Sequence, residues 1–140
     1  MGSFLSVSKG SSEDPVFLEM SFNNGGDSQS IVYVGKSLMM MLFVRKRTFS
    51  YIFSGKGVTF DTGGISIKPS NNMDKMRGDM GGAACVTGSI YAAASLKLPI
   101  NLKVLVPLCE NMPGGNATKP GDVVVARNGK SIQVTKQLTA

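Results

Sequence analysis

The chain has 140 residues, a hydrophobic fraction of 42% and a charged fraction of 17%, values that are typical of a globular domain. It contains no histidine, which excludes a Ser-His-Asp triad, a Cys-His pair and a histidine-based zinc helix. The formal charge of +6 does not by itself predict nucleic-acid binding, because the basic residues are scattered except for Arg45, Lys46 and Arg47.

Cysteine usage and hydropathy bear on the cellular compartment. Cys85 and Cys109 are too far apart for a C-x-x-C motif, and no segment resembles a secretory signal. The apolar run Ser37–Val44 is far shorter than the roughly 20 residues that span a bilayer. We therefore expect a cytoplasmic protein with free thiols, no membrane partner and no nucleic-acid partner.

The first half of the chain predicts strands. Pro15–Phe22 alternates apolar and polar residues, and Ile31–Gly35 is a short apolar run that ends in glycine. We expect the former at a sheet edge and the latter in the sheet interior. Gly57–Phe60 is a third predicted strand, and Asp61 begins the loop after it.

The second half predicts a helix, a strand and a hairpin. Met80–Leu98 is rich in small residues and predicts a helix that packs closely on a sheet. Ile100–Leu108 is a nearly continuous apolar run, typical of a strand buried on both faces. Asn128 and Gly129 predict a hairpin turn within Val123–Val134. The fold class is α/β, with a mixed, largely parallel sheet and flanking helices.

The stretch GKGVTFDTGGISIK, which ends at Lys68, places two lysines and an aspartate around a Thr-Gly-Gly turn. Lys56, Asp61 and the later Asp79 could form a metal site, because carboxylates suit hard divalent cations. A lysine amine can join them only if the cation holds it neutral. From these residues alone, a solvated or ion-paired lysine is the favoured interpretation, because lysine is an unusual metal ligand. Asp61 follows the carboxyl end of a strand, where ligands of open α/β sheets bind.

Longer segments carry a resemblance. GKGVTFDTGGISIKPSNNMDKMRGDMGGAA resembles the metal-binding signature of the leucyl aminopeptidase family of cytosolic di-metal exopeptidases. LKVLVPLCENMPGGNATKPGDVVVARNGKSIQV resembles the segment that follows it there, and MGSFLSVSKGSSEDPVFLE looks like the start of the catalytic domain. We therefore divide the chain into the start of a partial catalytic domain (1–35), a segment foreign to the family (36–55), the metal-binding part of that domain (56–134) and a divergent tail (135–140).

The resemblance implies a role for each matching residue. Lys56 and Asp79 would bind one metal ion, and Asp61 would bridge two. Lys68 would be a catalytic cation near the scissile carbonyl, and Met76 would help line the substrate pocket. The implied cofactors are two divalent metal ions, Zn or Mn and possibly Mg. We expect at most one weak site in these 140 residues, because the family's N-T-D-A-E-G-R run does not follow Val134.

The implied activity is removal of N-terminal residues, leucine preferred, from peptides or dipeptides. A metal-activated water would attack the carbonyl, and the implied assembly is a homo-hexamer. The alternative is an inactive, truncated fragment that associates with full-length aminopeptidase subunits. Because Gly-Lys occurs at both 35–36 and 55–56, either Lys36 or Lys56 could take the ligand position.

Overall fold

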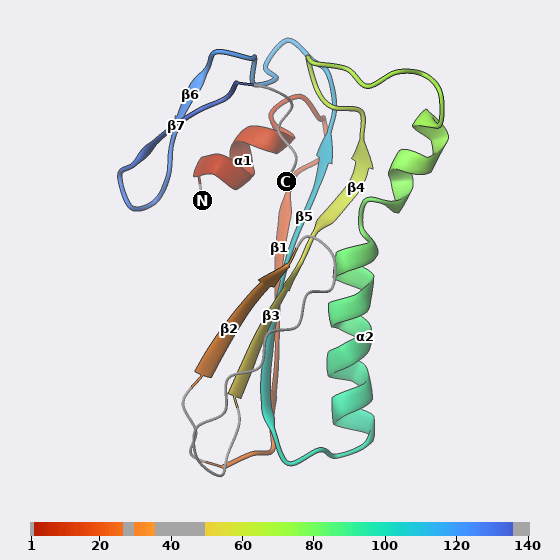
Figure 1. The fold of residues 1–140 in the computed structure, drawn as a ribbon, viewed down its shortest axis with the longest axis vertical. Coiled ribbons are helices and arrows are strands. Elements are labelled where there is room, and N and C mark those ends of the chain that lie inside the picture. Colours follow the sequence, from red (N-terminus) through yellow and green to blue (C-terminus); the bar gives the residue numbers. More distant parts are fainter. Residues whose placement is uncertain (1, 27–29, 36–49, 136–140) are drawn as a thin grey trace. The chain divides into compact units, whose positions relative to one another are not determined.

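The computed structural model describes residues 2–26, 30–35 and 50–135 (Figure 1). The chain divides into two compact units, which are described separately below. The first unit comprises Met1–Val16, Val58–Asp79 and Leu108–Ala140, and the second comprises Phe17–Gly57 and Met80–Pro107. None of the helices in this described part combines the length and apolar character that crossing a bilayer requires.

The second unit is built on a sheet in which the strands follow the order β1-β5-β3-β2. β2 runs parallel to β3 from the pair Ser30 and Ser50, and β3 runs parallel to β5 from the pair Ser50 and Asn101. The strands are β1 (Val16–Asn23), β2 (Ser30–Gly35), β3 (Ser50–Gly55) and β5 (Asn101–Asn111). Val16 of β1 and the last residues of β5, from Leu108, belong to the first unit. A largely parallel sheet in an α/β unit confirms the predicted fold class.

Two strand placements can be compared with the sequence predictions. The edge position of β1 is confirmed, since it is the outer neighbour of β5. The interior position predicted for Ile31–Gly35 is wrong for the strands of residues 2–26, 30–35 and 50–135, because β2 lies at the opposite edge of their sheet. Tyr51, Ile52 and Phe53 are strong strand formers, and the strand that they belong to takes the place beside β5.

β5 is less buried than its apolar sequence predicts. Within the second unit Leu102, Val104 and Val106 are buried, whereas Lys103 and Leu105 between them are half-buried. The strand therefore buries one face fully and not both. On the less buried face, Lys103 Nζ donates a hydrogen bond to the Glu19 carboxylate of β1 at 2.6 Å.

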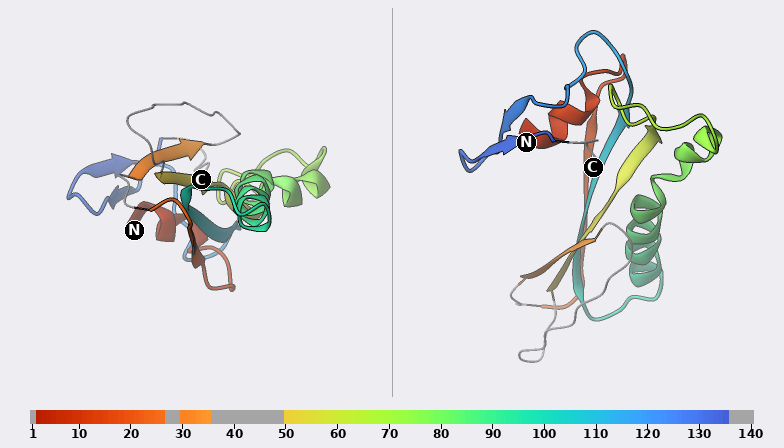
Figure 2. Two further views of the ribbon diagram at one scale, coloured as in Figure 1. Left: turned by 90° about the horizontal axis from the view of Figure 1, so that it is seen from below. Right: turned by 45° about the horizontal axis from the view of Figure 1, so that its top comes forward.

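Helix α2 (Gly81–Ser95) packs on β3 through its small residues (Figure 2). Its buried side chains recur at helical spacing. A Cβ added at Gly82 would lie 2.9 Å from the backbone nitrogen of Lys56, and one at Gly55 would clash with the Gly82 carbonyl. The helix therefore begins in direct contact with the end of β3. The buried residues are Ala83, Val86, Ile90 and Ala93.

The first unit contains shorter elements around a small core. Val7, Val58 and Cys109 are buried together, with Phe4 packed against them. The predicted hairpin is confirmed: Gly129 has φ 81° in its turn, and β6 pairs with β7 antiparallel. The elements are α1 (Gly2–Ser8), β4 (Gly57–Asp61), the 3-10 helix η1 (Met73–Gly78), β6 (Val123–Val125) and β7 (Ser131–Gln133).

The sequence did not predict α1 or η1. α1 is serine-rich, and the Ser6 and Ser8 hydroxyls donate to carbonyls of Ser3 and Leu5 in the same helix. Of the predicted foreign segment 36–55, residues 36–49 lie outside the described residues, as does 136–140 of the predicted tail. The proposed domain boundaries stay a prediction.

Candidate active site

The Thr-Gly-Gly turn directly after β4 explains the glycines of the lysine-rich stretch. Gly63 and Gly64 have φ angles of 93° and 71°, a region in which a side chain would be strained. The Thr62 hydroxyl donates to the Asn111 carbonyl at 2.7 Å and accepts the N–H of Gly64 at 3.1 Å. The N–H of Lys68 donates to the Thr62 carbonyl at 2.8 Å. This last hydrogen bond closes the loop from Thr62 to Lys68, so the turn fixes the backbone position of Lys68.

Asp61 lies at the end of β4 with only 1% of its surface exposed. Its Oδ1 accepts hydrogen bonds from the N–H of Gly63 at 3.1 Å and from Nδ2 of Asn111 at 2.8 Å. Burial opposes ionisation of this carboxyl. Hydrogen bonds with Lys68, Asp79 and Asn111, and the Lys68 charge, outweigh burial and lower the pKa of Asp61 from 3.8 to about 2. Asp61 is therefore a carboxylate at neutral pH.

Lys68 lies between two carboxylates. Its Nζ donates to Asp61 Oδ2 at 2.8 Å and is 3.6 Å from Asp79 Oδ2. The same Nζ is 3.2 Å from the Met76 sulfur, on η1. The side chains of Lys68 and Asp79 are 22% and 29% exposed, so the ion pairs are partly accessible to solvent. Four of the five predicted site residues therefore meet in the first unit.

Lys56, the fifth predicted residue, belongs to the second unit. It follows β3, and its carbonyl oxygen accepts the N–H of Ala83 at 2.9 Å. Its side chain is half-buried. The backbone of this lysine thus joins the end of β3 to the first turn of α2. Its assignment as a metal ligand stays a prediction.

The sequence prediction missed Asn111, which is the last residue of β5 and is 5% exposed. Its side chain donates to Asp61, and its carbonyl accepts two hydrogen bonds from Thr62. One signal could have identified it, because Asn111 is a polar residue at the end of a long apolar strand. That is the position where polar side chains of α/β proteins meet ligands.

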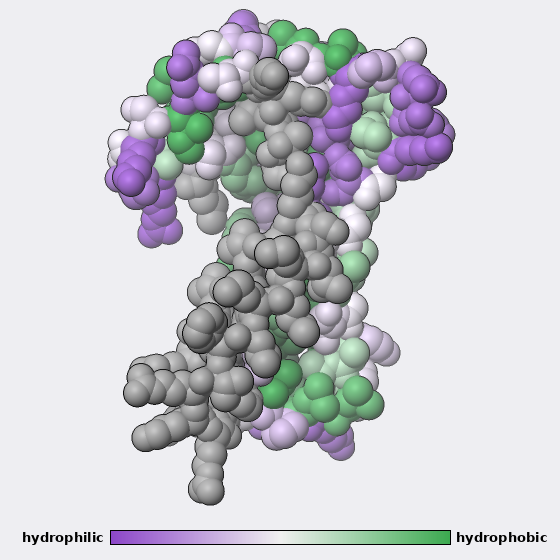
Figure 3. Space-filling view, viewed as in Figure 1, coloured by the Kyte–Doolittle hydropathy of each residue, from purple (hydrophilic) through white to green (hydrophobic). Residues whose placement is uncertain are grey.

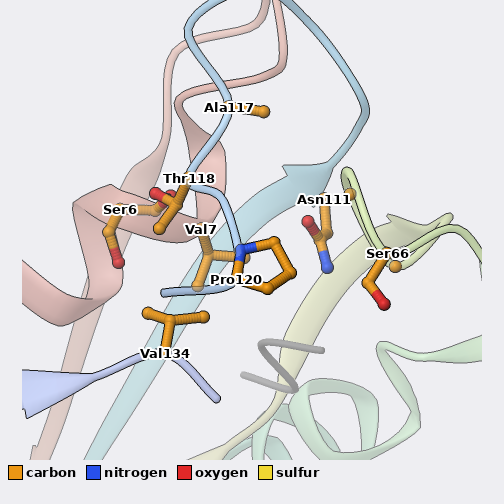
Figure 4. Close-up of a pocket in the computed structure, with 10 residues that line it drawn as sticks. Ser6, Val7, Ser66, Asn111, Ala117, Thr118, Pro120 and Val134 are labelled. Carbon is orange, nitrogen blue, oxygen red and sulfur yellow. The ribbon is translucent and has the colours of Figure 1, made fainter. Parts of the chain in front are cut away.

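The first unit also contains a small, open hollow (Figure 4). Figure 4 shows Ser66 and Asn111 on one side of it, and Ser6, Val7 and Thr118 on the other. Lys68, Asp79 and Met76 do not line it. The charged side chains of Asp61, Asp79 and Lys68 contact one another, whereas the hollow brings no such charged cluster together. We therefore place the candidate site at these three residues and not at the hollow.

The available metal ligands among these side chains are few. In the part of the chain that the structure describes, no group of three His, Cys, Asp or Glu side chains could hold a metal ion. Asp61 and Asp79 are two carboxylates that converge on one positive nitrogen. This pair fits a single divalent cation in part, and it does not fit two.

Comparison with known proteins identifies the family. A model of the cytosol aminopeptidase family, catalytic domain, matches residues 43–137. The chain belongs to the cytosol aminopeptidase family. It is 57% identical over 134 residues to cytosol aminopeptidase of Xenopus tropicalis and 54% identical to that of Homo sapiens. Each alignment covers 96% of this chain and 22% of the relative, so the chain spans about a fifth of their length.

Similar solved structures agree with the fold. Cytosol aminopeptidase from Coxiella burnetii is 30% identical with a TM-score of 0.75, over 97% of this chain and 25% of that chain. The bottromycin maturation enzyme BotP in complex with Mn is 34% identical with a TM-score of 0.74, over the same shares. The family named by the sequence resemblance and its α/β fold class are thus confirmed.

Proposed function

We propose that the chain supplies part of the active site of a metal-dependent aminopeptidase, which removes N-terminal residues, leucine preferred, from peptides or dipeptides. The observation that carries this proposal is the cluster in which Lys68 Nζ contacts Asp61, Asp79 and the Met76 sulfur. Membership of the cytosol aminopeptidase family supports the reaction class. The Mn complex of a similar solved structure supports a divalent cation.

Asp61, Asp79 and Lys56 would hold the cation, which could be Mn, Zn or Mg. Lys56 would bind as a neutral amine. Two carboxylates and one amine make at most one weak site. The second metal ion and a bridging role of Asp61 would need ligands beyond these residues.

Each side chain would have a distinct task in the reaction. A divalent cation, when bound, supplies Lewis-acid polarisation of the scissile carbonyl and makes water more acidic. Lys68 would donate hydrogen bonds to the oxygen on which negative charge develops. Met76 would offer a flexible apolar surface to the N-terminal side chain of the peptide. Asn111 and Gly63 would hold the Asp61 carboxylate in one orientation.

A chimera tests this function. Residues 56–134 would replace the matching segment of the Xenopus tropicalis relative, and hydrolysis of leucine amide would be measured with Mn²⁺. We expect hydrolysis, and a drop in kcat of about 100-fold or more in Lys68→Ala, because one oxyanion donor is lost. Lys75→Ala, on the exposed surface of η1, is the matched control and should keep its rate. A folded chimera without activity, or one indifferent to Lys68→Ala, would contradict the proposal.

The second candidate function is non-catalytic. The chain would associate with full-length aminopeptidase subunits, which the resemblance implies to be cytoplasmic homo-hexamers. Exposed apolar residues at the C-terminal end of α2, such as Leu96, favour such an association. We expect no hydrolysis of leucine amide by the isolated 140 residues with Mn²⁺ or Zn²⁺. Co-purification with a full-length subunit would support this function, and separate elution would contradict it.

A further inference from the structure

We propose that Asn128 is a modification site, at which the chain converts its own asparagine to aspartate or isoaspartate by reaction with water. The dipeptide Asn-Gly occurs twice in the chain, at Asn24–Gly25 and at Asn128–Gly129. Because glycine has no side chain to shield its backbone nitrogen, that nitrogen can approach the preceding side-chain amide closely. The two dipeptides lie in different surroundings, and these surroundings select Asn128. The inference is independent of the proposed function.

The reaction needs no reagent except water. The backbone nitrogen of Gly129 loses its proton to solvent and attacks Cγ of Asn128, and a cyclic imide forms as the side-chain amide takes up a proton and leaves as ammonia. Water then opens the ring. Cleavage of the new N–Cγ bond gives aspartate, and cleavage of the original peptide bond gives isoaspartate, whose main chain runs through Cγ. In sum, asparagine and water give a carboxylate and an ammonium ion, and nothing is oxidised or reduced.

The turn around Asn128 favours this reaction. Asn128, Gly129 and Lys130 are exposed, and a Cβ built on Gly129 meets no atom of the described residues within 4 Å, so a ring has room there. The N–H of Lys130 donates to Asn128 Oδ1 at 3.2 Å, which directs the side chain toward the backbone that follows it. This hydrogen bond also stabilises the oxygen that becomes negative during the attack. One contact opposes the reaction, because the N–H of Gly129 donates to the Ala126 carbonyl at 2.9 Å.

The surroundings of Asn24 oppose the same reaction more strongly. Its Nδ2 donates to the carbonyls of Lys97 and Leu98, at 3.0 Å each. The N–H of Gly25 donates to Asn101 Oδ1 at 2.8 Å. Gly25 is buried, and a Cβ built on it would lie 2.9 Å from the backbone nitrogen of Asn101, so little room is left for a ring. Both the attacking nitrogen and the leaving amide are therefore held in place.

Conversion of Asn128 would alter the β6–β7 hairpin. Either product adds a negative charge at a position between Arg127 and Lys130 in the sequence. Isoaspartate also adds a carbon to the main chain within the turn. Two backbone hydrogen bonds close this turn, from Gly129 N–H to the Ala126 carbonyl and from Ala126 N–H to the Lys130 carbonyl, at 2.9 Å each. A longer main chain cannot keep both, so isoaspartate would loosen the hairpin and aspartate would not.

The experiment compares the two asparagines within one protein. The purified 140-residue chain would be incubated at pH 8 in ¹⁸O-labelled water, and peptide mapping by mass spectrometry would measure the label that enters each position. We expect Asn128 to be converted about tenfold faster than Asn24, because two further hydrogen bonds must break at Asn24. A ratio above about threefold supports the inference. A smaller ratio, or no conversion of Asn128, overturns it.

Two controls test whether the fold causes the difference. In urea, where the chain is unfolded, Asn24 and Asn128 should react at similar rates, and a ratio that persists there would overturn selection by structure. In the folded chain, Asn101→Ala removes the acceptor of the Gly25 N–H and should speed conversion of Asn24 about fivefold without affecting Asn128. An unchanged rate at Asn24 would contradict its protection by these contacts. The urea comparison uses the wild-type chain, so it holds even if Asn101→Ala does not fold.

Discussion

Asn111 holds the buried Asp61 carboxylate from the end of a neighbouring strand. Its Nδ2 donates at 2.8 Å to an oxygen that water does not reach. We expect Asn111→Ala to lower the free energy of unfolding by about 1 to 3 kcal/mol, because a buried charged acceptor loses a donor. Urea unfolding would measure this. Asn116→Ala, at an exposed position of the following loop, is the matched control and should change stability by less than about 0.5 kcal/mol.

The depressed pKa of Asp61 predicts a pH dependence of stability. Its pKa is about 2 in the folded chain and 3.8 ordinarily, so the ionised form stabilises the fold above about pH 4. This contribution, about 2 kcal/mol, is lost as the pH falls from about 4 through 2. Urea unfolding with EDTA at pH 7, 4 and 2.5 would measure it. We expect Asp61→Asn to lack this loss, and an equal loss in both proteins would contradict the assignment.

The charged residues of the candidate site could be predicted from the sequence, because lysine and aspartate are themselves the reactive groups. Lys68 and Asp79 stand in a recognisable pattern, and the structure brings both of them to Asp61. Asn111 was not predictable in the same way, because 50 residues separate it from Asp61. Only the pairing of β4 with β5 joins them. The ion pairs also give Lys68 two carboxylate neighbours that a description of it as a free oxyanion donor does not include.

At the scale of the elements, the junction of β3 and α2 depends on two glycines in contact. A Cβ on Gly82 would lie 2.9 Å from the Lys56 nitrogen, which neither backbone can easily accommodate. We expect Gly82→Ala to lower the melting temperature. Gly88→Ala in the same helix has open space around its Cβ and should stabilise by about 0.5 to 1 kcal/mol. Thermal unfolding followed by circular dichroism compares them, and a similar response of both would refute the close approach.

Most strands were predictable from local patterns, but their order in the sheet was not. Alternation of apolar and polar residues identifies β1, and apolar runs identify β2 and β5. Asn128 and Gly129 predict the turn of the β6–β7 hairpin. The sequence gives no reason to prefer Ile31–Gly35 or Ser50–Gly55 beside β5, since both are short runs of strand formers that end in glycine and precede lysine. In the structure both segments are strands, and they pair in parallel with each other, from Ser30 with Ser50 to Gly35 with Gly55.

At the scale of the whole molecule, the chain is much shorter than its relatives and exposes large apolar side chains. The chain spans 22% of relatives to which it is more than 50% identical. Figure 3 shows hydrophobic side chains gathered at the C-terminal end of α2 and hydrophilic ones over η1. Tyr91 and Leu96 are 75% and 70% exposed. Large apolar side chains so accessible to water favour association with another protein surface.

This exposure predicts self-association of the isolated chain. We expect its apparent mass in size-exclusion chromatography with light scattering to rise with concentration, because contact between apolar surfaces removes them from water. Replacing Tyr91 and Leu96 together by lysine should shift the distribution toward monomer. Ser95→Lys, at an exposed position of the same helix, adds charge without removing apolar area and is the control. A mass that is independent of concentration in all three proteins would show that this end of α2 does not drive association, and an equal shift in the Ser95→Lys control would attribute the effect to charge alone.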